Sequence, residues 1–343
     1  MPPVRARAAA TVRDVAQAAG VSIATVSRAL AQPAIVRPAT RARIERAAAK
    51  LNYVSDGLAR ALSTGRTRTV GAVIPTLDTA IYSVSTHSLQ RELEQAGYTL
   101  LLACHEFDLA AEARMVRAFA ERGVDGLVLV GRQHDPAARR LVAAKAIPCV
   151  VTWALDDPRR GPSVGFDNRA AGRLVAAHLA DLGHRRIGMI SGRLAGNDRA
   201  ADRLEGVRAE LARRRLALPE RAVVEADYSL ASGAQALEVL LARVPVSAVI
   251  CGNDVLAIGA LQAAQRVGRR VPGDLSVAGF DDMPFARVVS PPLTTVRFPI
   301  EDVGSHAARY LLARLAGGTP ARRIELPIEL VVRASTGRAR RDA

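Results

Sequence analysis

The chain has 343 residues, of which 49% are hydrophobic and 24% charged, and this balance excludes a disordered protein and leaves room for two or three domains. Its net charge is +15, and residues 1–70 carry 12 basic and 3 acidic residues, a local net charge of +9. Positive charge gathered at one end favours an anionic partner, with nucleic acid first and a membrane surface second.

Targeting and cysteine patterns point to a reducing compartment. The first residues lack the apolar run of a secretory signal, and no window approaches 18 uninterrupted apolar residues, so we expect a cytoplasmic protein with no membrane partner. Cys104, Cys149 and Cys251 are far apart and form no CxxC pair. We therefore expect buried reduced thiols rather than a disulfide framework or a zinc site.

Residues 11–30, TVRDVAQAAGVSIATVSRAL, have the pattern of two short helices joined by a glycine turn. Thr11 with Asp14 predicts a capped start, Gly20 an end, and Ser22 a second cap. Val26 and Leu30 are expected to face inward, whereas Ile23 fits either orientation. A third helix over about 38–51 would close the core. The second helix presents small or polar groups suited to a groove: Ile23, Ala24, Thr25, Ser27 and Arg28.

The stretch 53–69, YVSDGLARALSTGRTRT, separates this region from the rest of the chain. Its helix-capable centre, 58–62, is too short to be a stable helix on its own in water. We predict a linker that becomes ordered only against another surface. The expected division is a helix-turn-helix headpiece at 1–54, a hinge helix and linker at 55–69, and a core at 70–343.

From Val70 onward, apolar strands alternate with amphipathic helices, which predicts an α/β core of two doubly wound parallel-sheet lobes. The expected helices of the first half lie near 83–96, 109–122 and 136–145. The expected strands are 70–75, 99–103, 126–130 and 149–151, and then 186–190, 222–226, 247–251 and 275–280.

Polar clusters follow several predicted strands, at the edge of a parallel sheet where ligands bind. They lie at 75–78, 165–168, 252–254 and 279–282 and include Asp167, Asn253 and Asp281. Two similar lobes that face each other with such edges predict a hinged cleft.

An ordered set of motifs covers nearly the whole chain. It includes TVRDVAQAAGVSIATVSRAL, GVDGLVLV, GHRRIG (183–188), RLEGVRAEL (203–211), CGNDVLAIGAL (251–261) and VAGFDDMPFARVVSPPLTTV (277–296). With this set the chain resembles the LacI/GalR family of bacterial transcription regulators. The resemblance implies a DNA-binding headpiece, a hinge helix, a core like that of periplasmic sugar-binding proteins, and a homodimer on a palindromic operator.

The resemblance also implies that the lobes are not contiguous in sequence. The first would take about 70–166 plus 298–320, and the second about 167–297 plus 321–336. The short basic tail has no leucine heptads, so we expect no tetramerising coil.

The resemblance assigns DNA-binding positions. Ile23, Ala24 and Arg28 fall at the base-reading positions, where Arg28 can pair bidentately with guanine. Thr11, Ser22, Thr25 and Ser27 are expected to contact phosphates or to cap helices. In the hinge pattern that contains Arg60, Leu62 takes the place of the side chain that wedges into the minor groove, or it packs on the partner hinge. Asp56 and Gly57 depart from the family pattern.

The resemblance also assigns effector positions. Arg203 matches the arginine that grips a ligand hydroxyl or carboxylate, Asp281 the hydroxyl-binding acid, and Tyr228 the aromatic that stacks on a ligand. The other candidates are Ile81, Tyr82, Trp153, Asp167 and Asn253. Trp153 fits a sugar face or the core, and Asp281 also fits a helix cap. The expected effector is a sugar, a sugar acid or a similar metabolite.

Three classes of function compete. A repressor whose DNA affinity is set by an effector in the cleft fits best, and a solute-binding protein without regulatory DNA binding is the alternative. An enzyme is not expected: no GxGxxG follows the first strand, no Ser/His/Asp or metal constellation appears, and no cofactor is expected. His184, in the GHRRIG turn, fits a structural role. Whether the effector induces or corepresses stays open.

Overall fold

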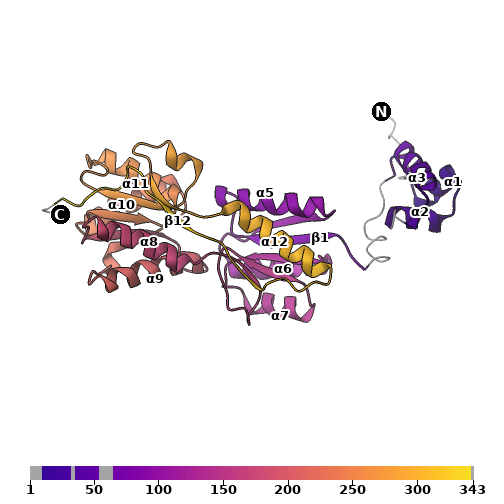
Figure 1. The fold of residues 1–343 in the computed structure, drawn as a ribbon, viewed down its shortest axis with the longest axis horizontal. Helices are drawn as coiled ribbons and strands as arrows, with labels where there is room; N and C mark the ends of the chain where they lie inside the picture. Colours follow the sequence, from indigo (N-terminus) through magenta and orange to yellow (C-terminus); the bar gives the residue numbers. More distant parts are fainter. Residues whose placement is uncertain (1–9, 32–34, 54–64, 341–343) are drawn as a thin grey trace, which may run out of the picture. The chain divides into compact units, whose positions relative to one another are not determined.

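The computed structural model describes residues 10–31, 35–53 and 65–340. The chain divides into two compact units, one of residues 1–69 with 123–125 and one of residues 70–122 with 126–343. The described part of the first unit is helical, whereas the second unit holds two sheets flanked by helices (Figure 1).

The helices of the first unit are α1 (Val12–Ala19), α2 (Ile23–Ala31) and α3 (Pro38–Leu51). The predicted start of α1 is confirmed as a capping box. The Asp14 carboxylate accepts from the Thr11 backbone N–H at 2.7 Å, and the Thr11 hydroxyl accepts from the Asp14 N–H. Gly20 ends α1 with φ of 61°, as predicted. The small core consists of Val15, Ala16, Ala19, Val26, Ala29, Ile44 and Ala47.

The first lobe of the second unit is built on a six-stranded sheet in the order β11-β5-β4-β3-β1-β2. In this lobe α5 packs against α12 and α6 against α7, and the two helix pairs lie on opposite faces of the sheet (Figure 1). The strands are β1 (Thr69–Ile74), β2 (Thr99–Cys104), β3 (Gly126–Val130), β4 (Cys149–Thr152), β5 (Ser163–Gly165) and β11 (Arg323–Glu325). The helices are α5 (Ala80–Gln95), α6 (Leu109–Glu121), α7 (Pro136–Ala144) and α12 (Ile300–Leu315).

The second lobe repeats this architecture with strand order β12-β10-β9-β8-β6-β7, in which β12 alone among the described pairs runs antiparallel. Here α8 packs against α9 and α10 against α11, again on opposite faces. The strands are β6 (Ile187–Gly192), β7 (Val223–Ala226), β8 (Ala248–Cys251), β9 (Ser276–Asp281), β10 (Thr294–Arg297) and β12 (Glu329–Val331). The helices are α8 (Asn168–Asp181), α9 (Asp198–Arg213), α10 (Leu230–Arg243) and α11 (Asp254–Arg266). The predicted α/β fold of two doubly wound lobes is confirmed.

One expected lobe assignment is wrong. The segment 321–336 was expected to lie wholly in the second lobe, but β11 pairs in parallel with β5 of the first sheet, with Ile324 opposite Val164. Only β12 joins the second sheet, opposite β10. The chain adds β11 because β5 would otherwise be an edge strand with unpaired backbone groups.

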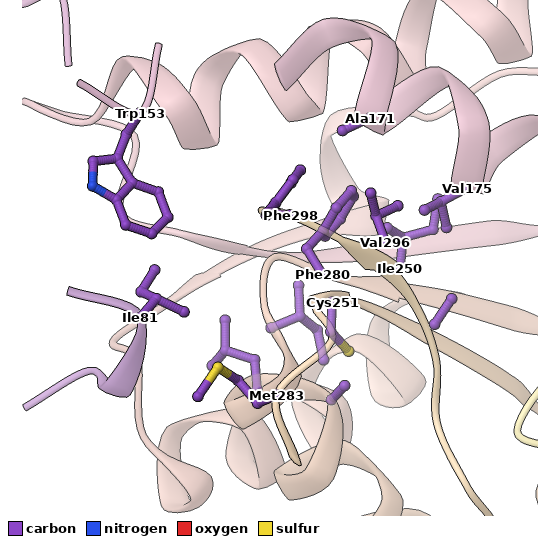
Figure 2. Close-up of a cluster of buried hydrophobic side chains, with 14 of the residues drawn as sticks. Ile81, Trp153, Ala171, Val175, Ile250, Cys251, Phe280, Met283, Val296 and Phe298 are labelled. Carbon is purple, nitrogen blue, oxygen red and sulfur yellow. The ribbon is translucent and has the colours of Figure 1, made fainter. Parts of the chain in front are cut away.

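The buried core continues through the segments that connect the lobes. Phe166, which follows β5, stacks on Phe298, which follows β10, with ring centroids 4.0 Å apart. Phe298 also faces Phe280 of β9 at 6.3 Å. Figure 2 shows Phe280 and Phe298 with Trp153 and Ile81 of the first lobe on the other side of the cluster. The connections between the lobes are therefore part of the core.

The described residues also settle the state of the cysteines and the question of a membrane-spanning helix. The three cysteines are free thiols, and burial raises the pKa of the Cys149 thiol to about 12. No helix there is long and apolar enough to cross a membrane.

Candidate DNA-binding face and ligand cleft

The outer face of α2 is exposed and polar. Ser22 begins the helix: its hydroxyl accepts from the Thr25 backbone N–H at 3.2 Å and lies 2.8 Å from the Thr25 hydroxyl. Ile23 points outward, with 42% of its surface exposed, which decides between its two expected orientations. No described residue forms an ion pair or hydrogen bond with the Arg28 guanidinium. The exposed members of this face are Ser22, Ile23, Ala24, Ser27 and Arg28.

Two of the expected DNA-binding residues, Arg60 and Leu62, lie outside the described residues, as does most of the predicted hinge. Thr11 is described, and its hydroxyl is 2.7 Å from the Asp14 carboxylate. Its observed role is to cap α1.

The two lobes enclose a narrow polar chamber. Its volume is about 10 Å³, enough for about one water molecule. The lobes must therefore move apart for any molecule much larger than water to enter the chamber. The chamber is lined by Thr79, Ile81 and Tyr82 of the first lobe and by Asn197, Arg199, Arg203, Tyr228, Asn253 and Asp281 of the second.

Arg203 is held in place by its hydrogen bonds. On α9 it is 6% exposed, and its Nε donates to the Asn168 side-chain oxygen at 3.1 Å while Nη1 donates to the Gly252 carbonyl at 2.7 Å. The guanidinium carbon also lies 5.2 Å from the centre of the Phe280 ring. Asn168 in turn donates to the Trp153 carbonyl at 2.9 Å. The orientation of the Arg203 guanidinium is thus set before any ligand binds.

Asp281 is the buried acid of the chamber. It is 2% exposed, and no described group forms a hydrogen bond with its Oδ1 atom. Burial raises the pKa of Asp281 to about 7, although the nearby Arg203 acts in the opposite direction. Burial and the charge of Asp281 raise the pKa of the neighbouring Asp254, whose carboxylate accepts from the Thr295 hydroxyl at 2.6 Å. An unsatisfied buried oxygen is a strong acceptor for a ligand hydroxyl.

Arg199 connects the lobes. It is 3% exposed and donates to Asp198 at 2.7 Å, and it interacts electrostatically with Tyr82 of the first lobe. Burial alone would lower the pKa of Arg199, but its neighbours Tyr82 and Asp198 outweigh burial and raise it. Asp198 also accepts from Arg132 of the first lobe, at 2.8 Å from its backbone N–H and 3.1 Å from Nε. These contacts tie the first lobe to the start of α9.

Aromatic rings form the walls of the chamber. Tyr82 meets Trp153 edge to face at 5.2 Å, and Trp153 meets Phe166 at 6.0 Å. Trp153 is 4% exposed and lies behind Tyr82, so it belongs to the core rather than to the lining of the chamber. On the opposite wall the Tyr228 hydroxyl accepts from the Asn197 amide at 3.1 Å, and the Tyr228 ring faces Phe107 at 6.1 Å.

Asp167 does not join the chamber. Its carboxylate caps α8 by accepting from the Ala170 N–H at 2.9 Å and lies 3.3 Å from Arg173, and 40% of its side chain is exposed. The expected effector role of Asp167 thus has no geometric support, because the next residue, Asn168, turns inward instead. The expected residues that do line the chamber are Ile81, Tyr82, Arg203, Tyr228, Asn253 and Asp281.

Thr79, Asn168 and Asn197 are site residues that were not expected from the sequence, and Arg199 was noted only as part of a basic region with Arg203 and not as a ligand-binding residue. A signal existed for Arg199, since it lies four residues before Arg203 and therefore on the same face of α9. Asn168 ends the polar cluster 165–168, whereas nothing local marks Asn197 or Thr79.

A wider opening lies outside the chamber. It has a volume of about 340 Å³ and shares Thr79 and Tyr228 with the chamber. Its rim is charged: Arg193 donates to Asp227 at 3.1 Å, and Asp78 and Glu106 lie across from them in the lining. The chamber and the opening together form the inter-lobe cleft.

Comparison with known proteins supplies the wider context. Residues 11–56 match the family model described as bacterial regulatory proteins, lacI family, and residues 176–336 match a periplasmic binding protein-like domain. The ribose operon repressor of Escherichia coli (strain K12) is 34% identical over 332 residues, which covers 95% of this chain and 99% of the relative.

Solved structures agree with these matches. The lac repressor dimer bound to operator and the anti-inducer ONPF is 29% identical, with a TM-score of 0.84 over 96% of this chain and 99% of that chain. A complex of the transcriptional regulator CelR with cellobiose is 31% identical, with a TM-score of 0.71 over 95% of this chain and 99% of that chain. These relatives are transcription regulators, not enzymes. The exposed helix-turn-helix, the two-lobed core and the similarity along 95% of the chain agree, and the protein belongs to the LacI family of bacterial regulatory proteins.

Proposed function

We propose that this protein is a repressor that binds a palindromic operator as a homodimer and is controlled by a small polyhydroxylated effector held in the inter-lobe cleft. The observation that carries this proposal is the buried chamber, where the unpartnered Asp281 oxygen and the fixed Arg203 guanidinium lie between two lobes. The proposed division is a DNA-binding headpiece at 1–54, a hinge at 55–69 and an effector-binding core at 70–343.

On the DNA side, α2 is the proposed recognition helix. Its outward Arg28 would pair with a guanine edge, and the outward Ile23 and Ala24 would contact thymine methyl groups or read groove shape. Ser22, Thr25 and Ser27 would lie against phosphates. Support comes from the exposure of this face and the basic charge around it. In the hinge, Arg60 and Leu62 are proposed to contact the minor groove, with Leu62 as the wedge.

In the cleft, each polar group has a proposed partner on the ligand. Asp281 would accept from one or two hydroxyls, and the Asn253 amide nitrogen would donate, because its oxygen already accepts from the Leu256 N–H at 2.9 Å. Ile81, Tyr82 and Tyr228 would cover the apolar faces of the sugar ring.

The charges of the chamber favour a neutral sugar over a sugar acid. Arg199 is already paired with Asp198, and Arg203 faces Asp281. A neutral polyol leaves these contacts intact, whereas a ligand carboxylate would bring a negative charge beside Asp281 and further disfavour ionisation of a carboxyl whose pKa burial already raises to about 7. An uncharged ligand with several hydroxyls is the best match.

Contacts between the two lobes would couple ligand binding in the cleft to DNA binding. The tie from Arg132 to Asp198 joins the two lobes in this closed arrangement. A ligand that bridges the lobes favours this closed arrangement and shifts DNA affinity by the same free energy by which DNA shifts ligand affinity.

The test is fluorescence anisotropy of the full chain on DNA from upstream of its own gene, against a scrambled duplex, across a salt series. Tight binding to the upstream duplex alone at physiological salt is expected, and Leu62→Ala should weaken it. Arg28→Ala should weaken it by about tenfold or more. Arg41→Ala removes the same charge from α3, where Arg41 lies 3.5 Å from Glu45, and should change affinity far less. Equal, steeply salt-dependent binding to both duplexes would refute operator reading.

A further inference from the structure

A further cavity of the described core lies in the first lobe, apart from the cleft. It has a volume of about 680 Å³, within the range of small-molecule sites. It is bounded by the end of α7, the start of β4, the end of α12 and the loops around 156–162 and 319–322. None of its lining residues lines the inter-lobe cleft.

One side of this cavity is strongly basic. Among its described lining residues there is one acid, Asp156, against four arginines: Arg139, Arg160, Arg314 and Arg322. No described residue forms a hydrogen bond or ion pair with the guanidinium of Arg160 or Arg322, whereas Arg314 donates to the Gly318 carbonyl at 2.9 Å. Arg314 and Arg322 act electrostatically on the Tyr310 hydroxyl, which places positive charge beside this buried ring. The excess of positive charge suits an anionic phosphate group.

A buried histidine supplies an independent sign of a ligand. The His134 side chain is 2% exposed and lines the cavity, and its Nδ1 atom lies 3.0 Å from both carboxylate oxygens of Glu112, which is fully buried. Nδ1 therefore carries a hydrogen toward Glu112. The other ring nitrogen, Nε2, is buried and has no partner among the described residues. A buried nitrogen without a partner is costly unless a ligand satisfies it.

The remaining walls are apolar. They are formed by Leu129, Val142, Ile147, Pro148, Val151, Pro162 and Pro320. A bare inorganic ion would leave this surface in contact with water, whereas a ligand with an apolar body would bury it.

We propose that this cavity is a second ligand site, which takes an organic phosphate monoester. The phosphate lies against Arg160 and Arg322 with the Tyr310 hydroxyl nearby, and the organic group packs on the apolar walls. His134 Nε2, which has a free lone pair while Nδ1 carries the hydrogen, accepts a hydrogen bond from the P–OH group of the monoester's monoanion. This site is independent of the sugar proposed for the cleft.

The probe is phenyl phosphate, titrated into the full chain by isothermal titration calorimetry at constant ionic strength. Saturable binding of one molecule per chain is expected, with inorganic phosphate and phenol each at least about tenfold weaker. The double variant Arg160→Ala/Arg322→Ala should weaken phenyl phosphate binding by about tenfold or more. The matched control Arg159→Ala/Arg323→Ala removes the same two charges from neighbouring positions outside the lining and should change affinity less than about twofold.

The outcomes separate the alternatives. All four side chains are exposed, so both variants should fold, which the emission of the buried Trp153 verifies. Equal weakening by both variants would show that only net charge matters and would overturn the site. An unchanged affinity in Arg160→Ala/Arg322→Ala would place the probe elsewhere, including beside Arg199 and Arg203 in the cleft, and would also overturn it. Absence of saturable binding, or inorganic phosphate binding as tightly as phenyl phosphate, would refute the proposed ligand class.

Discussion

Substitution of the buried acid in the cleft by its neutral isostere, Asp281→Asn, should make the core more stable than that of the wild type, by an amount that grows as pH rises. The ordinary pKa of this carboxyl is 3.8, and burial in the closed chamber raises it to about 7. Between these values the unfolded chain has lost the proton that the folded chain keeps, so the free energy of unfolding of the wild type falls as pH increases. Asparagine does not titrate, so the free energy of unfolding of the variant has no such dependence on pH at this position.

The size of the effect follows from the two pKa values. At pH 5.5 the solution is above the unfolded-state pKa of 3.8 but still below the folded-state pKa. The free energy of unfolding of the wild type has therefore already fallen by about 2 kcal/mol. By pH 8.5 the loss has reached its full value of about 4 kcal/mol, because the folded group has then ionised as well. The difference in the free energy of unfolding between Asp281→Asn and the wild type should therefore widen by about 2 kcal/mol from pH 5.5 to 8.5.

The assay is urea unfolding at pH 5.5, 7.0 and 8.5, followed by the emission of Trp153, the only tryptophan in the chain. This residue is buried in the core, so its signal reports the core and not the headpiece. Titrating groups away from Asp281 are common to both proteins and cancel in the difference. Asp254, whose pKa is raised in part by the charge of Asp281, ionises more easily in the variant and widens the difference in the same direction. A difference constant within about 0.5 kcal/mol, or one that narrows, would mean that Asp281 is hydrated in solution and that the closed chamber is not the resting arrangement.

Three further substitutions test the packing and the caps. Arg203→Met should lower the free energy of unfolding of the core by about 2–4 kcal/mol, because it leaves the Gly252 carbonyl and Asn168 without their donor. The control Arg208→Met on the same helix loses only an exposed ion pair with Glu220. It should lower the free energy of unfolding by less than about 1 kcal/mol in the same Trp153 assay. Gly304→Ala places a methyl group against the Ser85 carbonyl where α12 meets α5 and should cost about 1–3 kcal/mol in urea unfolding, whereas Gly161→Ala, which meets no atom within 4 Å, should stay within about 0.5 kcal/mol. Thr11→Ala removes the capping box of α1 and should lower headpiece stability by about 1 kcal/mol, measured by amide exchange over residues 12–19; unchanged exchange would contradict the role of this cap.

Local sequence patterns predicted most of the fold. The strand expected at 126–130 and the helix expected at 38–51 have those bounds, because each is marked by uninterrupted apolar residues or by helical spacing. His184 is buried and bonded to Ser247 and Ser276 at 2.9 and 3.0 Å, which confirms its expected structural role. By contrast β11 has three residues, of which only Ile324 is apolar, so no periodic signal reveals its pairing with β5.

Residue patterns alone predicted the candidate site only where a strand end carried a distinctive residue, whereas Ile81, Tyr82, Arg203 and Tyr228 were expected from the family resemblance. Asp281 ends strand β9 and Asn253 follows strand β8, at the edge where ligands bind, and both line the chamber. The same rule selected Asp167, which became a helix cap while Asn168 turned inward. That choice depends on how α8 packs against Arg203 of α9, a tertiary contact that no local pattern encodes.

The central claim is that a ligand bound in the inter-lobe cleft sets operator affinity. The most direct measurement is operator anisotropy across a panel of sugars and sugar acids, with Trp153 emission recorded on the same samples. We predict that one neutral sugar changes both signals over the same concentration range, and that Asp281→Asn shifts both midpoints together by about tenfold or more. A compound that changes operator affinity equally in the wild type and in Asp281→Asn, with no change at Trp153, would contradict the account.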